Sequence, residues 1–190
     1  MEPKKTVGFA LCGSFCTFHR ILPVLKTMAE QYTLIPILSP TAYETDTRFG
    51  AAADFRAQIE TICKRPILHT VAGVEPFGPK KLLDLLVIAP CTGNTLAKIA
   101  NGISDTSVTL AAKSHRRNKR PVVIAVSTND GLSGNAKNIG VLLNTEGFYF
   151  VPFGQDDPIQ KEASLVANME AIPQTVAAVL GGKQIQPLLI

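Results

Sequence analysis

The sequence predicts an α/β fold in which a doubly wound, mostly parallel sheet is covered by helices on both faces. Short apolar runs alternate with stretches of helical periodicity along the 190-residue chain. Most of these runs are continuously apolar, which is typical of parallel strands that are buried on both faces. No internal repeat, low-complexity tract or linker interrupts the pattern. We therefore expect a single domain over residues 1–190, long enough to bury a substantial core.

Five apolar segments are predicted as strands. They lie at residues 6–11, 34–38, 85–89, 122–126 and 148–151. Since helical stretches separate them, right-handed crossover connections are expected between neighbouring strands.

Seven segments are predicted as helices. They lie roughly at residues 14–30, 51–63, 95–101, 106–116, 135–145, 161–169 and 172–180. Ser14 is a candidate N-cap for the first helix, and Pro23 inside it is expected to cause a kink or a restart. Gly102 and Gly147 are expected to end helices, and Pro173 to lie in the first turn of the last one.

The composition favours a protein with little surface charge. Hydrophobic residues make up 46% of the chain, charged residues 18%, and the mean hydropathy is +0.18. Some apolar surface is therefore expected to face another subunit in a homo-oligomer. The basic run at residues 113–120 is predicted to be a solvated helix end, because no nucleic-acid-binding motif accompanies it. We expect no nucleic-acid partner.

Cysteine spacing and hydropathy argue against metal binding and membrane insertion. The four cysteines show no C-x-x-C pair and the three histidines do not cluster with them, so no metal site is expected. The apolar run near the N-terminus is too short for a signal peptide, and no stretch approaches the length of a membrane span. These features favour a reducing cytoplasm.

The loops that follow the predicted strands are the candidate ligand sites, because open α/β sheets bind ligands beyond the carboxyl ends of their strands. After the first strand, Gly13 permits close backbone approach and Ser14 opens a helix, which together favour a phosphate. An ordinary tight turn is the alternative. The turn is not G-x-G-x-x-G, and no acidic residue ends the second strand, so dinucleotide binding by that fingerprint is disfavoured.

The second strand is followed by Ser39, Thr41 and Arg48, which offer two hydroxyls and a cation. An ordinary polar loop would have similar chemistry.

The strand at residues 85–89 is followed by six small or polar residues, Pro-Cys-Thr-Gly-Asn-Thr. Thr92, Asn94 and Thr95 donate and accept hydrogen bonds, and Gly93 would let a planar ligand lie against the backbone. A helix cap needs only one of Asn94 and Thr95. The remaining polar groups therefore indicate a ligand. The loop "STNDGLSGN", which follows the next strand, gathers further small polar groups.

These loops resemble those of the homo-oligomeric flavin-containing cysteine decarboxylases and their flavin prenyltransferase relatives. In that family a PASANT-type loop, here residues 90–95, is followed by a helix like "LAKIANGISD". "GSFC" and "ILSPTA" match its first two flavin-contacting loops, so the resemblance covers roughly the first 150 residues. It implies a Rossmann-like or flavodoxin-like flavoprotein, FMN as cofactor, and trimers that assemble into larger shells such as a dodecamer.

The resemblance also implies roles for individual residues. Those expected to contact FMN are Gly13, Ser14, Phe15, Cys16, Ser39, Thr41, Pro90, Cys91, Thr92, Gly93, Asn94, Thr95, Ser127, Thr128 and Asn129. The first four would meet the phosphate, and Ser39 and Thr41 would approach the phosphate and the ribityl chain. The residues that would line the isoalloxazine are Cys91, Thr92, Asn94 and Thr95. Asn94 would hold a substrate carboxylate, and Asn129 matches the asparagine of the family's PxMN motif.

Two departures from the family pattern argue against decarboxylation of a cysteinyl substrate. The decarboxylases carry a catalytic histidine about eight residues before the aspartate that corresponds to Asp84, where this chain has "VEPFGPKK". His69 lies further upstream and is expected to be structural or at the surface. The PxMN motif also lacks its proline and methionine.

A closer resemblance, carried by "GFALCGSFCTF" and "GPKKLLDLLVIAPCTGNTLAKIANGI", is to one subunit of a two-subunit oxidoreductase of endospore-forming bacteria. It implies a partner subunit with a nicotinamide-binding Rossmann domain, a dicarboxylate substrate and a planar aromatic dicarboxylate product. The chemistry of Asn94, Thr92 and Arg48 suits such a dicarboxylate. Two alternatives remain. In the first, the chain would be a non-catalytic partner with a vestigial flavin cavity. In the second, it would be a stand-alone flavin-dependent decarboxylase or prenyltransferase. "STNDG" lacks the arginine and glutamate residues typical of the prenyltransferases.

Overall fold

The computed structural model describes residues 3–190 and contains a central sheet with the strand order β2-β1-β3-β4-β7-β6, in which β5 also pairs with β4. The strands are β1 (Thr6–Leu11), β2 (Thr33–Leu38), β3 (Leu85–Cys91), β4 (Val122–Thr128), β5 (Phe148–Phe150), β6 (Phe153–Gly154) and β7 (Leu165–Ala167). Strands β1 to β5 pair in parallel, and β6 and β7 are antiparallel. The predicted mostly parallel sheet is confirmed.

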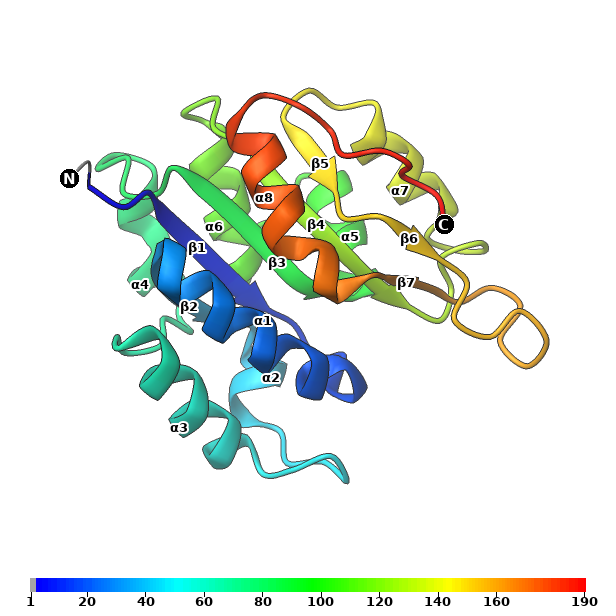
Figure 1. Ribbon diagram of the computed structural model, residues 1–190, viewed down its shortest axis with the longest axis horizontal. Coiled ribbons are helices and arrows are strands. Elements are labelled where there is room, and N and C mark those ends of the chain that lie inside the picture. Colours follow the sequence, from blue (N-terminus) through cyan, green and yellow to red (C-terminus); the bar gives the residue numbers. More distant parts are fainter. Residues whose placement is uncertain (1–2) are drawn as a thin grey trace.

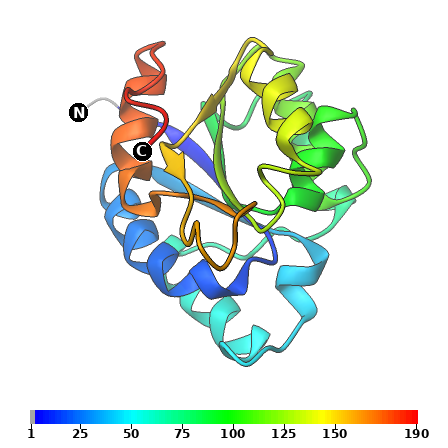
Figure 2. The same cartoon turned by 90° about the vertical axis from the view of Figure 1, so that its right-hand side faces the viewer.

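Helices cover both faces of the sheet. They are α1 (Phe18–Gln31), α2 (Pro40–Glu44), α3 (Ala52–Cys63), α4 (Val71–Val74), α5 (Gly93–Ala100), α6 (Ser107–Arg116), α7 (Ala136–Leu143) and α8 (Ile172–Leu180). Helices α1 and α8 lie on one face, whereas α5, α6 and α7 lie on the other (Figures 1 and 2). The doubly wound arrangement is therefore confirmed. Within residues 3–190, no helix combines the length and the apolar character that a membrane crossing requires.

The core is centred on the three middle strands of the parallel part. Every residue of β3 is buried, as are nearly all residues of β1 and β4. These strands have helices on both sides, which is why their sequences are continuously apolar. Burying each large aliphatic side chain contributes about 1.5–3 kcal/mol to folding.

The parallel strands follow the order β2-β1-β3-β4-β5, which is the flavodoxin-like order. From β1 the chain moves outward to β2, and it then returns to place β3 on the other side of β1. This reversal leaves a crevice between the carboxyl ends of β1 and β3, where such folds bind ligands. The loops after these two strands therefore lie side by side.

The helix predicted at residues 161–169 is wrong. Residues Leu165–Ala167 form β7, which pairs antiparallel with the end of β4 and with β6. Leu165 and Ala167 are buried, whereas Val166 is half-buried. Backbone pairing with β6 and with β4, which is distant in sequence, decides this conformation, because it outweighs the weak local preference for a helix.

The start and course of the first helix also differ from expectation. The Ser14 side chain makes no capping bond, and the chain enters α1 through a 3-10 turn, η1 (Phe15–Thr17). Helix α1 contains Pro23 without a restart, because its buried face, which includes Leu25, packs along its length. Gly102 follows α5 in the left-handed region, at φ +72°, as a helix stop should.

The second glycine expected to stop a helix has another role. Helix α7 ends at Leu143, and Gly147 leads into β5 with φ +80°. The Arg116 guanidinium lies so close to Gly147 that a Cβ at this position would collide with it. Arg116 donates to the carbonyls of Arg120 and Glu146, both at 2.7 Å. The basic run is thus more than a solvated helix end, since it ties two loops together.

Candidate functional site

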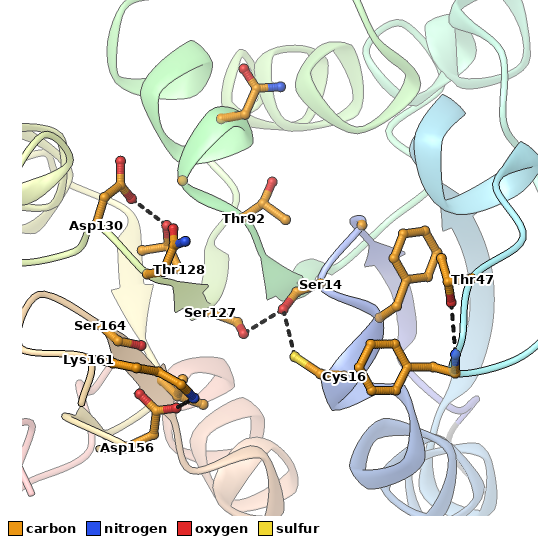
Figure 3. Close-up of a pocket in the computed structure, with 17 residues that line it drawn as sticks. Ser14, Cys16, Thr47, Thr92, Ser127, Thr128, Asp130, Asp156, Lys161 and Ser164 are labelled. Carbon is orange, nitrogen blue, oxygen red and sulfur yellow. Dashed lines mark hydrogen bonds and ion pairs between the residues drawn. The ribbon is translucent and has the colours of Figure 1, made fainter. Parts of the chain in front are cut away.

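A cavity of about 760 Å³ opens at the carboxyl ends of β1, β3 and β4. Its volume is within the range typical of small-molecule and cofactor sites. Ten of the sequence-predicted site residues line it, namely Gly13, Ser14, Phe15, Cys16, Thr92, Gly93, Asn94, Ser127, Thr128 and Asn129. The turns after β1, β3 and β4 therefore face one common space (Figure 3).

The turn after β1 forms one wall. The hydroxyl oxygens of Ser14 and Ser127 are 2.8 Å apart, and the Cys16 thiol lies 3.7 Å from the Ser14 hydroxyl. At Gly13 a Cβ would meet the Thr41 methyl at 3.1 Å, so a larger residue would be crowded. The first N–H groups of a helical segment have no partners within it. This wall therefore offers hydroxyl, thiol and backbone donors.

The turn after β3 is held in place by its own cap. Thr92 is the N-cap of α5, and its hydroxyl accepts a hydrogen bond from the Thr95 amide at 3.4 Å. The sequence had suggested Asn94 or Thr95 for this cap. With Thr92 in that role, the Asn94 side chain is left to line the cavity.

Gly93 is required by an internal contact. A Cβ on Gly93 would lie 2.5 Å from the side chains of both Thr128 and Asn135, and 2.8 Å from Asp130. The missing side chain, which the sequence analysis relates to contact with a planar ligand, is also needed for α5 to pack against the loop after β4.

That loop carries a polar network. The Asp130 carboxylate accepts one hydrogen bond from the Thr128 hydroxyl and another from the Asn135 amide, at 2.8 Å. The Asn135 side-chain carbonyl accepts in turn from the Asn138 amide, also at 2.8 Å. Because both carboxylate oxygens are engaged, Asp130 is fixed at the cavity wall.

The segment between β6 and β7 supplies another wall, with Asp156, Lys161 and Ser164, and Val166 of β7 lies beside them in the lining. The Lys161 ammonium lies 3.0 Å from an Asp156 carboxylate oxygen. The hydrogen bond from Asp156 raises the pKa of Lys161 above its ordinary value. Lys161 and Asp156 lie on the other side of the Ser14–Ser127 contact from Thr92 (Figure 3).

Five residues expected at the site do not line the cavity. They are Ser39, Thr41, Pro90, Cys91 and Thr95. Ser39 caps α2 by accepting from the Ala42 amide, and Thr41 packs beside Gly13. The Pro90 carbonyl accepts from the Cys12 amide at 3.1 Å, and the Thr95 hydroxyl donates to the Cys12 sulfur at 3.3 Å. These residues support the two turns from behind.

The buried thiols near the site are not poised as nucleophiles. Burial raises the pKa of Cys12 to about 11, and it raises the pKa of Cys91 well above its ordinary value. Neutral thiols are poor nucleophiles and poor metal ligands. In the described part of the chain, residues 3–190, no cluster of three or more His, Cys, Asp or Glu side chains could hold a metal ion.

Sequence reasoning missed seven residues of the cavity, namely Thr47, Phe49, Asp130, Asp156, Lys161, Ser164 and Val166. Asp130 directly follows Asn129 in the loop "STNDGLSGN", which the sequence analysis had identified as a candidate ligand site. Its place in that loop could therefore have identified Asp130 as a cavity residue. Lys161, Ser164 and Val166 were missed because residues 161–169 were predicted as a helix. Asp156 was missed because it lies in the irregular segment before that helix.

Two residues noted in the sequence lie away from the cavity lining. The Arg48 guanidinium lies over the Phe49 ring, 4.9 Å from its centroid. The His69 ring stacks on Tyr43 with centroids 3.6 Å apart and planes within 7°. His69 thus has a packing role, as expected, and the cation expected from Arg48 comes instead from Lys161.

The sheet order and the cavity at the β1–β3 crevice define a flavodoxin-like α/β protein with a ligand site at its topological switch point. The chain belongs to the Flavoprotein family, whose model matches residues 1–182. It is 41% identical over 187 residues to the B subunit of dipicolinate synthase of Bacillus subtilis strain 168, a match that covers 98% of this chain and 94% of the relative. The resemblance inferred from the sequence motifs is thereby confirmed.

Solved structures agree with this assignment. The crystal structure of the dipicolinate synthase B subunit from Bacillus halodurans C superimposes with a TM-score of 0.90 and 46% identity, covering 99% of this chain and 97% of that one. DmrB from Burkholderia xenovorans, solved in complex with FMN, has a TM-score of 0.68 and 19% identity, covering 96% and 98% of the two chains. At that identity the second likeness shows the fold alone.

Proposed function

We propose that this chain is the B subunit of a dipicolinate synthase, which acts with a separate A subunit to oxidise a dihydrodipicolinate-type precursor to dipicolinate during sporulation. The observation that carries the proposal is the similarity to dipicolinate synthase B subunits over nearly the whole chain, in sequence and in structure. An enzyme-related role is also consistent with a putative phosphopantothenoylcysteine decarboxylase of Dictyostelium discoideum, which is 26% identical over 91% of this chain.

FMN fits the chemistry of the cavity. The walls combine the hydroxyls of Ser14, Thr92 and Ser127 with the amides of Asn94 and Asn129 in a space of about 760 Å³. Hydroxyl and N–H donors near the start of α1 suit a phosphate, and the amide groups suit the heteroatom edge of a flat ring. When bound, a flavin would supply a two-electron acceptor.

The residues of this chain would bind and orient the substrate. Converting a dihydropyridine into a pyridine removes one hydride and one proton. Asn94 is a donor suited to a carboxylate. Thr128 and Asn135 hold Asp130 at the wall, where its remaining lone pairs can accept an N–H or O–H group of the ligand. The A subunit would contribute a nicotinamide-binding domain.

The assembly and location follow from the same proposal. We expect a homo-oligomer built from trimers, in the mother-cell cytoplasm of a sporulating bacterium. Ile103, Leu132, Val141 and Leu143 are large apolar side chains exposed at the surface, which supports burial against other copies.

The test combines a spectrum with reconstitution. The purified chain is mixed with FMN, separated from free flavin, and its visible spectrum recorded. We expect a bound flavin spectrum, and dipicolinate formation when the A subunit and a dihydrodipicolinate-type precursor are added. A chain that neither binds FMN nor restores dipicolinate formation would contradict the proposal.

A non-catalytic role for this chain is the second candidate. It is favoured by the segment that lacks the family histidine, which folds here as the 3-10 helix η2 (Glu75–Phe77) with Phe77 buried. Colourless protein that still stimulates dipicolinate formation by the A subunit would support this candidate. Turnover of a cysteinyl or prenyl substrate by the chain alone would instead support a decarboxylase or prenyltransferase.

A further inference from the structure

Lys161 is the one cation among the described residues that line the cavity, which also contains the carboxylates of Asp130 and Asp156. The loop between β6 and β7 places its side chain there. The Lys161 amide donates to the Asp157 carbonyl at 2.8 Å, and the Ser164 amide donates to the Lys161 carbonyl at 2.9 Å. The backbone on both sides of Lys161 is thus held in place.

The Lys161 ammonium has N–H donors that its contact in the structure does not use. Its contact in the structure is the Asp156 carboxylate at 3.0 Å, and the side chain is 55% exposed. An ammonium group has three N–H donors, so the pair with Asp156 leaves others available to a ligand. The hydrogen bond to Asp156 also raises the pKa of Lys161, in the direction that favours the charged ammonium.

The other charged groups nearby offer no positive charge to an anionic ligand. Asp130 is itself a carboxylate, and each of its two oxygens accepts one hydrogen bond, from Thr128 or from Asn135. The Arg48 guanidinium lies over the Phe49 ring, and Arg48 itself does not line the cavity. An anionic ligand that enters the cavity therefore finds its counter-ion in Lys161.

We propose that Lys161 determines substrate specificity by binding one carboxylate of the substrate, while Asp156 holds the ammonium at the cavity wall before the substrate arrives. The inference rests on the proposed function and names the group that recognises its dicarboxylate. It predicts preference for a dicarboxylate over a monocarboxylate of the same ring, because only the former provides a second anionic group for Lys161 after the first has engaged the opposite wall.

The experiment measures binding to the FMN-treated chain by isothermal titration calorimetry, with pyridine-2,6-dicarboxylate and pyridine-2-carboxylate as probes. Loss of a charge-assisted hydrogen bond should weaken dicarboxylate binding of Lys161→Met about tenfold or more. Lys161→Arg should recover most of that affinity. Asp156→Asn should weaken dicarboxylate binding, but less than Lys161→Met does, because the ammonium remains while the carboxylate that holds it at the cavity wall is lost. A dicarboxylate affinity that is unchanged or higher in Asp156→Asn would overturn the role given to Asp156. Lys26→Met, at an exposed position on α1, is the control and should match the wild type.

Further titrations distinguish whether Lys161 binds the substrate carboxylate or the FMN phosphate. FMN and riboflavin differ by the phosphate, and neither should lose affinity in Lys161→Met. If Lys161→Met weakens FMN but not riboflavin, and leaves dicarboxylate binding unchanged, Lys161 serves the phosphate and the inference is overturned. Equal dicarboxylate affinity in the wild type and Lys161→Met, or no measurable binding to the wild type, also overturns it.

Turnover with the A subunit reports on the proposed function separately. We expect Lys161→Met to raise KM for the precursor about tenfold, with a much smaller change in kcat, because a binding contact is removed. If the wild-type mixture forms dipicolinate and Lys161→Met keeps its KM, the inference fails and the function stands. If the wild-type mixture forms none, the function fails, and the calorimetry still decides whether Lys161 recognises carboxylates.

Discussion

The hydroxyl groups of Ser14 and Ser127 lie 2.8 Å apart, although 113 residues separate them and strand β3 lies between their strands β1 and β4. The contact spans the end of β3, where Thr92 and Gly93 begin the next turn. Three loops from distant parts of the chain therefore meet at one point. The cavity exists because of this convergence.

Replacing Ser14 with Ala should weaken FMN binding about fivefold to tenfold, as expected for the loss of one hydrogen bond of about 1 kcal/mol. Stability should fall by about 1 kcal/mol, because the buried Ser127 hydroxyl loses its hydrogen-bond partner, whereas no helix cap is lost. Flavin fluorescence titration measures the affinity, and Thr27→Ala, an exposed position on α1, is the control. Unchanged affinity in Ser14→Ala would place the flavin elsewhere.

Replacing Gly93 with Ala should destabilise the protein by about 1–3 kcal/mol, because overpacking forces neighbouring groups to move. The added Cβ would fall 2.5 Å from the side chains of Thr128 and Asn135. Gly140→Ala is a matched control, since Gly140 lies within α7 and has no atom within 4 Å of its would-be Cβ. That variant should gain about 0.5–1 kcal/mol. Urea denaturation distinguishes the two, and equal stability changes would contradict the packing described at Gly93.

Stability should fall as the pH drops from about 6.5 to about 4, partly through His115. Burial is the main cause that lowers the pKa of His115 from 6.5 to about 4, and the charges of Arg120 and Arg116 contribute. The unfolded chain therefore binds a proton on this residue before the folded protein does. The stabilisation is complete above pH 6.5 and is lost as the pH falls toward 4, by about 3 kcal/mol at most.

The measurement is the free energy of unfolding at several pH values for the wild type and His115→Gln. Glutamine does not titrate, and its amide is able to replace the ring nitrogen that lies 3.0 Å from the Pro121 carbonyl. The variant should lose the His115 part of the slope between pH 6.5 and 4. Identical slopes in both proteins would show that His115 is not the titrating group.

Replacing Gln184 with Ala should cost about 1–3 kcal/mol, because it leaves a buried backbone N–H without a partner. The Gln184 side chain accepts from the Phe150 amide at 2.9 Å and donates to the Phe150 carbonyl at 2.7 Å, as a neighbouring strand would. Gln174→Ala, at an exposed position on α8, should be nearly neutral. Thermal unfolding compares the two variants. Equal melting temperatures would mean that water satisfies Phe150 instead.

Much of the site could be predicted because the relevant signals are local. Gly13 and Ser14 lie within three residues of the end of one buried strand, and Thr92 and Asn94 lie within three residues of the end of another. A parallel sheet places all such strand ends on one edge, so these residues had to lie near each other. The supporting roles of Ser39, Pro90 and Thr95 could not be predicted in this way, because they depend on which groups face the interior behind each turn.

The sequence by itself determined the alternation of strands and helices, the mostly parallel sheet, and the turns at the crevice, since each follows from periodicity within a short segment. Tertiary structure alone decided that Leu165–Ala167 is a strand, that Gly93 packs against the loop after β4, and that Lys161 rather than Arg48 is the cation of the cavity. The physical reason is that these features depend on partners distant along the chain: the backbone of β4, the Asn135 side chain and the Asp156 carboxylate. A pattern within a short sequence segment does not indicate which distant residues will be its partners.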